Sequence, residues 1–214
     1  MRRIAWGRIA IIVALVLVTL VFVRVTETAD HEYEQVRDPH VYALIGSTAI
    51  ERSDVERSYA QRSADQADLS LEEYFDTAYA PRMLLLIEAR SEGITVSDEE
   101  VDVWIMIINS SLQSQNASFD EYLEDLDRSY EELREDIRSS MLLEKALDRF
   151  VAEQVMVTAQ EVQEAYDAAG YAALNITLEE ARNEIGPRIL REKQEARLHE
   201  VLAELRERYD VRIV

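Results

Sequence analysis

Apolar residues recur at the helical spacing of three and four positions along much of the chain. Between residues 130 and 150 they form one stripe that comprises Leu133, Ile137, Met141, Leu147 and Phe150. Because residues at this spacing share one side of a helix, the stripe predicts an amphipathic helix. A second apolar series, from 177 to 209, predicts a helix of roughly 30 residues. The middle of that helix, Arg191–Arg197, is almost wholly polar, so we expect it to run partly through solvent.

A repeated local motif marks where helices begin. Seven hydroxyl residues are each followed three positions later by a glutamate: Ser53, Ser70, Ser97, Ser118, Ser129, Thr158 and Thr177. In this capping box the hydroxyl accepts the backbone N–H of the third residue, and the glutamate accepts the backbone N–H of the cap. The seven motifs therefore predict seven helix starts. They also explain runs of acids such as Asp98–Glu100 without any acid–base catalysis.

The helix predicted after Ser70 contains two residues that disturb helices. Pro81 lacks a backbone N–H and its ring clashes with the preceding turn, so it predicts a kink or break before Met83. Gly93 suits the end of the helix, where a left-handed backbone conformation is common. Between them, Met83–Ile87 is apolar on every side, which predicts burial.

Strands are predicted at the two ends of residues 41–214. Val41–Ile45 and Thr48–Ile50, separated by Gly46 and Ser47, have the pattern of a β-hairpin. Val211–Val214 alternates in the same way. Because a lone hairpin is marginally stable in water, we expect the last strand to pair with Val41–Ile45. Residues 41–214 would then form one mainly helical domain with a small β-ribbon made by its N- and C-terminal strands.

The N-terminal segment has the pattern of a membrane or signal segment. Arginines and no acids flank an apolar run that includes Ile9, Val13, Leu17, Leu20 and Val23. Residues 1–24 are therefore predicted to be a cleaved signal peptide or a retained signal anchor, and residues 25–40 a polar tether. The anchor is favoured because Ile4–Val23 is long enough to span a bilayer, whereas Arg24 follows the run directly and leaves only Thr26 and Thr28 as small residues at the spacing of a cleavage site. Under both alternatives residues from about 25 onward are exported, because flanking arginines stay in the cytoplasm. We expect the domain on the periplasmic side, anchored in the cytoplasmic membrane by residues 4–23.

Composition and charge exclude several classes of function. The chain has no cysteine and three scattered histidines, which excludes thiol catalysis, thiolate metal sites and an imidazole metal centre. Glycine-rich phosphate loops and nucleophile elbows are also missing from the sequence. We therefore expect no catalytic residues, no metal and no cofactor. Residues 25–214 hold all 43 acids but only 19 of the 23 basic residues, a surface that repels nucleic acid and favours neutral or basic partners.

The helix predicted after Ser97 is apolar on two sides. One side is a core face that comprises Val101, Trp104, Ile105, Ile108 and Leu112. Val103, Met106 and Ile107 project from the opposite side. Such a helix is either wholly buried between neighbours or presents its second face to another molecule. Our hypothesis is that Val103, Met106 and Ile107 line a groove, rimmed by acids, that binds unfolded polypeptide segments. Methionine suits such a surface because it is flexible.

Five stretches, taken in order, resemble a known family. They are VYALIGSTAIERSDVERSY (41–59), MLLLIEARSEGITVSDEEVD (83–102), SFDEYLEDLDRSYEELREDIRSSMLLEKAL (118–147), VMVTAQEVQEAYD (155–167) and the closing helix and strand (177–214). This order is similar to the N-terminal chaperone module of the SurA/PrsA/PpiD-type periplasmic folding factors. The resemblance implies export, a helical client-binding module and strand pairing between the two ends of the module.

The same family often carries a parvulin prolyl isomerase domain before the final helix. In this chain only Asp167–Thr177, 11 residues, lies at that place. Because a domain needs about 50 residues or more, no parvulin domain fits there, and no catalytic residues are transferred from the family.

The sequence thus predicts a membrane-tethered extracytoplasmic chaperone of the holdase type. Its partners would be unfolded or nascent exported polypeptides, with the membrane contacted through the N-terminal segment and no nucleic acid bound. Prolyl isomerase activity is not expected. The alternative is a structural accessory subunit of an envelope or membrane protein complex, which would use the same surface for one fixed partner.

Overall fold

A computed structural model describes residues 38–62 and 66–214. The predictions for the membrane segment, residues 1–24, and for most of the tether, residues 25–40, lie outside the described residues. Within the described ranges, no helix combines the length and the apolar character that crossing a membrane requires.

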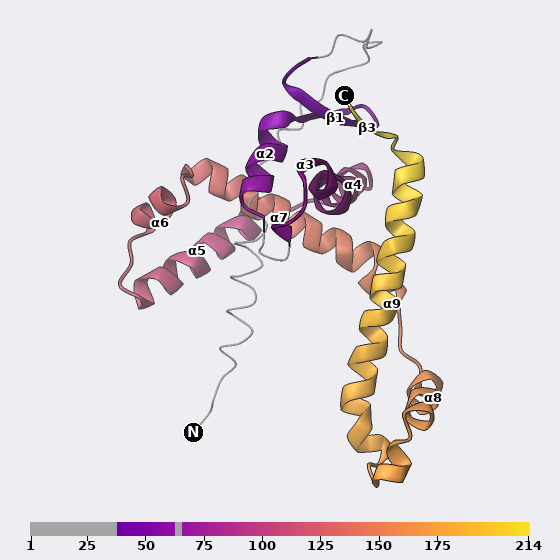
Figure 1. Cartoon of the computed structure of the whole chain (residues 1–214). Coiled ribbons are helices and arrows are strands. Elements are labelled where there is room, and N and C mark those ends of the chain that lie inside the picture. The colour runs from indigo at the N-terminus through magenta and orange to yellow at the C-terminus, as the bar shows by residue number, and fades with distance from the viewer. Residues whose placement is uncertain (1–37, 63–65) are drawn as a thin grey trace.

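The described chain is mainly helical with one small sheet (Figure 1). The strands are β1 (Val41–Ile45), β2 (Thr48–Glu51) and β3 (Val211–Ile213). The α-helices are α2 (Arg52–Ala60), α3 (Leu71–Tyr74), α4 (Ala80–Ser91), α5 (Asp98–Ser114), α6 (Phe119–Asp125), α7 (Tyr130–Phe150), α8 (Ala159–Ala169) and α9 (Leu178–Arg208). The other turns of helix are η2 (Phe75–Tyr79, π), η3 (Ala152–Gln154, 3₁₀) and η4 (Tyr171–Leu174, 3₁₀).

Six of the seven predicted capping boxes form. They begin at Ser70, Ser97, Ser118, Ser129, Thr158 and Thr177. The prediction at Ser53 is wrong, because α2 begins at Arg52 and Glu51 occupies the N-cap position. Glu51 is also the last residue of β2, so strand and helix are continuous and Ser53 already lies inside the first helical turn. Its hydroxyl donates to the Glu51 carboxylate at 3.4 Å.

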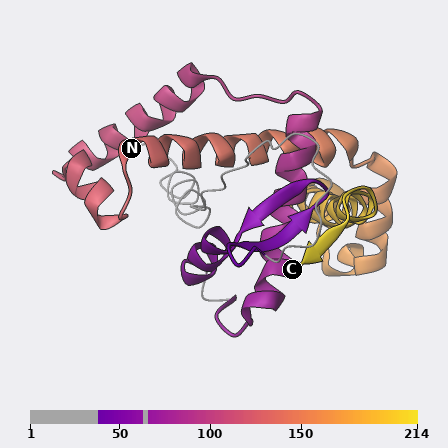
Figure 2. The ribbon, with the colours of Figure 1, turned by 90° about the horizontal axis from the view of Figure 1, so that it is seen from above.

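The predicted pairing of the two ends of the domain is confirmed. The strand order is β2-β1-β3, and β1 pairs antiparallel with both neighbours. Ala43 lies opposite Ile213, and the Gly46 N–H donates to the Asp210 carbonyl oxygen at 2.9 Å. Figure 2 shows β3 beside the hairpin of β1 and β2. Gly46 has a φ of +59° in the tight turn between β1 and β2, a conformation that glycine adopts without strain.

The break predicted at Pro81 takes the form of a wider helical turn. The helix continues from α3 through the π-helical turn η2 into α4, and Pro81, which has no N–H to donate, is the second residue of α4 and follows this wider turn directly. In η2 the Ala80 N–H donates to the carbonyl oxygen of Phe75, five residues earlier. Gly93 ends α4 with a φ of +74°, as predicted, and the Ile94 N–H donates to the Ala89 carbonyl oxygen at 2.9 Å.

A central core joins the sheet to α2, the α3–α4 helix, the second half of α7 and the end of α9. Phe75, Ile45 and Ile50 are among its largest fully buried side chains. Met83 through Leu86 are all buried here and Ile87 packs against them, which confirms the burial predicted for that run.

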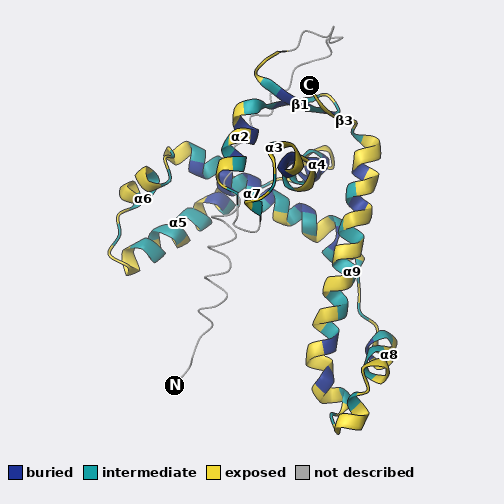
Figure 3. Cartoon of the chain, in the orientation of Figure 1, coloured by how far each residue is buried: buried dark blue, intermediate teal, exposed yellow. Residues whose placement is uncertain are grey.

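Two smaller clusters lie at opposite ends of this core (Figures 1 and 3). In one, α5 and α6 pack on the first half of α7 around Val101, Leu133 and Ile137; we name residues 98–127 the α5–α6 arm. In the other, α8 and η4 pack on the first half of α9 around Val162 and Ile185; we name it the α8–α9 arm. As predicted, α9 is mostly exposed between this arm and the core.

The α7 stripe is confirmed in its first half, and in its second half Leu147 and Phe150 are half-buried against the central core. Leu133 and Ile137 are buried against α5, but Leu142 and Ala146 are the buried residues that follow. Met141, which continues the predicted stripe, is only half-buried. The cause is a change of neighbour, since the second half of α7 packs on α4 within the central core.

Candidate functional site

The outward face of α5 exposes three large apolar side chains in a row. Val103 is 49% exposed, Met106 60% and Ile107 47%. Of the residues in α5 only Val101 is fully buried, and Trp104 and Ile105 are half-buried against α6 and α7. The alternative of a wholly buried α5 is therefore excluded. We name Val103, Met106 and Ile107 the α5 stripe.

Ion pairs with α7 fix the orientation of α5. Arg134 contacts the carboxylates of Asp98 and Asp102, and Arg138 contacts Asp98 at 2.6 Å. Further along α7, the Lys145 ammonium lies 2.7 Å from the carboxylate of Glu100. These contacts hold the paired acids toward α7 and leave the α5 stripe on the opposite side.

The Lys145 contact also affects the ionisation of Glu100. Lys145 donates to the carboxylate and the Ser97 backbone N–H donates to it as well. Both bonds favour the charged form, so the pKa of Glu100 is lowered from its ordinary value. Glu100 is therefore an ionised structural group that joins α5 to α7.

The acids at the base of α5 are thus largely engaged with α7. Glu99 differs, because it is exposed and lies one helical turn before Val103, in line with the α5 stripe. The grouping of the stripe residues into a groove stays a prediction.

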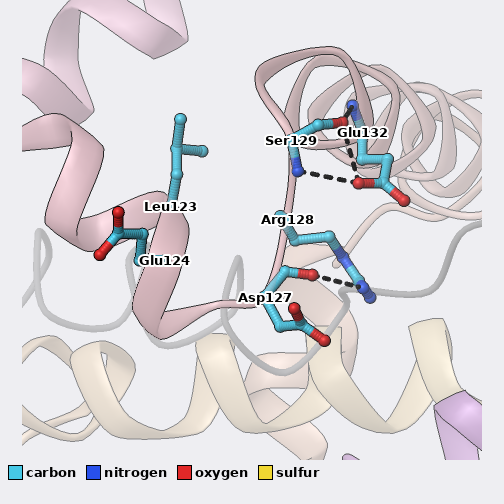
Figure 4. Close-up of a pocket in the computed structure, with 6 residues that line it drawn as sticks. All are labelled: Leu123, Glu124, Asp127, Arg128, Ser129 and Glu132. Carbon is cyan, nitrogen blue, oxygen red and sulfur yellow. Dashed lines mark hydrogen bonds between the residues drawn. The ribbon is translucent and has the colours of Figure 1, made fainter.

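A hollow of about 380 Å³ lies at the turn between α6 and α7, and none of the residues that line it belongs to the α5 stripe (Figure 4). Its lining is mostly polar and comprises Leu123, Glu124, Asp127, Arg128, Ser129 and Glu132. Ser129 and Glu132 are already bonded to each other in a capping box. The polar groups of this capping box are therefore already paired within the protein.

Arg128, which lines this hollow, also forms a buried ion pair that the sequence analysis missed. Arg128 Nε donates to Asp136 Oδ2 at 3.3 Å, and the two side chains are 6% and 0% exposed. Burial raises the pKa of Asp136 to about 6, although the charges of Arg128 and Arg82 act in the opposite direction. The available signal is its spacing, since Asp136 lies three residues after Leu133 on the buried side of α7.

A second buried carboxylate joins α4 to the end of α9. Glu88 accepts a hydrogen bond from the Tyr209 hydroxyl at 2.8 Å and pairs with Arg208. Burial favours the neutral acid, but the hydrogen bonds from Tyr209 and Arg208 outweigh it, so the pKa of Glu88 is lowered. Both missed carboxylates hold elements together, and among the described residues no group of three or more His, Asp or Glu could hold a metal ion.

Comparison with known protein families gives one match. The family model described as the SurA-like N-terminal domain matches residues 1–147. The chain belongs to this family. The match includes the α5 stripe and confirms the resemblance inferred from the sequence, and the SurA-like family is of the chaperone type.

The family match ends inside α7. The elements beyond it, α9 and β3, complete the central core and the sheet. No curated protein matches the chain.

Proposed function

We propose that the protein is an extracytoplasmic chaperone of the holdase type. It binds non-native exported polypeptides through the α5 stripe and has no prolyl isomerase activity. Its N-terminal segment, residues 4–23, holds it at the cytoplasmic membrane, so that clients are met as they leave the membrane.

The exposure of the α5 stripe carries this proposal. Single exposed apolar side chains are common on protein surfaces, but Val103, Met106 and Ile107 are neighbours at helical spacing and form one continuous patch. Covering such a patch is favourable by roughly 25 cal/mol per Å² of apolar area. A patch of this size favours weak and broad binding, which suits a protein that must release its clients.

The support of α5 is the second argument. The ion pairs with Arg134, Arg138 and Lys145 keep the stripe directed outward. Because the core face of α5 is occupied by α6 and α7, the helix is not free to rotate and bury the stripe. Folding of the described domain therefore does not bury the patch.

Suppression of aggregation tests the proposal. The full chain, reconstituted through its apolar N-terminal segment into zwitterionic nanodiscs, is added to a denatured test protein diluted from guanidinium. We expect wild type to suppress light scattering, and a variant with Val103→Ser, Met106→Ser and Ile107→Ser to lose most of this effect.

The matched control replaces two exposed apolar residues of similar size elsewhere. Met156 and Leu174 are 77% and 67% exposed and lie outside the α5–α6 arm, so Met156→Ser with Leu174→Ser should behave like wild type. Circular dichroism must show the same helix content in all three proteins. Full suppression by a correctly folded triple variant would overturn the proposal.

Two further measurements separate this function from its competitors. A photo-crosslinker in place of Met106 should capture a mixed population of exported polypeptides in cells, whereas one stoichiometric partner would indicate an accessory subunit. A proline-peptide assay should give only the uncatalysed isomerisation rate, and a catalysed rate would contradict the absence of enzymatic activity.

A further inference from the structure

The α5–α6 arm is unusual in the sign of its charge. Residues 98–127 contain nine acids and no Lys, Arg or His. Within residues 38–62 and 66–214, the cations paired with acids of α5 come from α7, namely Arg134, Arg138 and Lys145. The arm therefore presents apolar and acidic groups to solvent, but no basic group of its own.

One acid, Glu99, lies on the same side of α5 as the stripe. Glu99 is exposed one turn before Val103, whereas Asp102 is already paired with Arg134 of α7. Toward the other end of α5 the same face continues with the neutral residues Ser110 and Gln113. The face thus has an acidic end, an apolar middle and a neutral polar end.

From this arrangement we infer that the α5 stripe selects extended polypeptide segments in which apolar residues lie close to Lys or Arg. This inference rests on the proposed function and specifies its client class. Apolar side chains cover Val103, Met106 and Ile107, while a basic side chain lies beside Glu99. Charge complementarity of this kind sets preference and association rate more than total affinity.

The dimensions of the face set the spacing in the client. Glu99 and Ile107 are eight residues apart, which is about 12 Å along a helix. An extended segment covers this length with about four residues. The basic residue should therefore lie three or four positions from the apolar residues that it accompanies.

Charge also disfavours the other occupants of this face. A second copy would bring the same acids and a net charge of −20 to the interface. An anionic lipid surface is repelled for the same reason. Crosslinking from position 106 to another copy of the chain, or to anionic lipid, would overturn the inference.

Peptide binding tests the preference directly. Three disordered 12-residue peptides share one apolar centre and carry two Lys, two Ser or two Glu at three or four positions from it. Their affinities for the full chain in zwitterionic nanodiscs are measured by fluorescence anisotropy, with empty nanodiscs as the blank. We expect the Lys peptide to bind about three- to tenfold more tightly than the Glu peptide at low salt. The difference should shrink at 0.5 M NaCl, because salt screens exposed charges.

The chain offers a closely matched control for the local role of Glu99. Glu99 and Glu179 are exposed and occupy the same position, the second residue after the cap, in the capping boxes of α5 and α9. Glu99→Lys should remove the preference for the Lys peptide, whereas Glu179→Lys changes net charge equally and should preserve it.

Each outcome bears on a different conclusion. Equal binding of the three peptides, abolished by the triple serine variant, would overturn the basic preference and leave the proposed function standing. Unchanged binding by the triple variant would overturn the stripe as the site, and with it the proposed function. An equal loss of preference in Glu99→Lys and Glu179→Lys would show that only net charge matters, which would overturn the local role of Glu99.

Discussion

At the scale of single residues, two buried carboxylates behave in opposite ways. Glu88 receives hydrogen bonds from Tyr209 and Arg208 that outweigh its burial, so its pKa is lowered. For Asp136 burial outweighs the charge of Arg128, and the pKa is raised to about 6. Folding therefore favours the ionised form of Glu88 and the protonated form of Asp136.

This difference gives a pH prediction for Asp136. The folded pKa of about 6 lies above the unfolded value near 3.9, so the folded state binds the proton more tightly. Its contribution to stability is complete below about pH 4 and is lost as the pH rises through about 6. Relative to Asp136→Asn, which does not titrate, the wild type should lose about 2–3 kcal/mol of unfolding free energy between pH 4 and pH 7. Urea unfolding of both proteins at several pH values measures this, and a constant difference would contradict it.

At the scale of elements, the helix starts could be predicted because a capping box is local. The hydroxyl, the glutamate and the N–H groups that they satisfy lie within four residues, as at Ser129. Ser53 fails because β2 runs directly into α2, which depends on pairing between strands. Asp136 and Glu88 bind partners outside their own helices, Arg128 and Arg208. The pattern of residues along one helix could therefore not predict these ion pairs.

A pair of alanine substitutions measures this distinction. Ser129→Ala removes the hydroxyl that accepts the Glu132 N–H at 3.2 Å, and should cost about 1 kcal/mol of unfolding free energy. Ser53→Ala removes a hydroxyl that caps nothing and should cost much less. Equal losses of unfolding free energy, measured in urea, would show that both hydroxyls cap a helix and would contradict this distinction.

At the scale of the whole molecule, the sheet joins the start of the described domain to its end. The family match stops at residue 147, but β3 and the end of α9 complete the sheet and the central core. The closure was predictable because an unpaired hairpin is marginal. The two arms were not predictable, because the sequence shows that each helix has an apolar face but not which other helix that face packs against.

Two proline substitutions in β3 test how much the closure contributes. The bonds from Gly46 to Asp210 and from Val214 to Tyr42 place Arg212 in a hydrogen-bonded position opposite Leu44. Arg212→Pro should therefore cost about 1–2 kcal/mol of unfolding free energy. Ile213→Pro removes an N–H that faces the open edge of the sheet and bonds to no other strand. Its loss of unfolding free energy, measured by urea unfolding, should therefore be smaller. A larger loss for Ile213→Pro would contradict the register.

Two segments join the α8–α9 arm to the core: the exposed middle of α9, and residues 151–158, which connect α7 to α8. Each residue added to α9 would advance the α8–α9 arm by about 1.5 Å and turn it by about 100° relative to the core. Insertions of seven residues, close to two full turns, would lengthen the reach and nearly restore the direction. Residues 151–158 would have to lengthen by the same distance, so the spacing between core and arm can change in steps of two turns only when both segments are extended together.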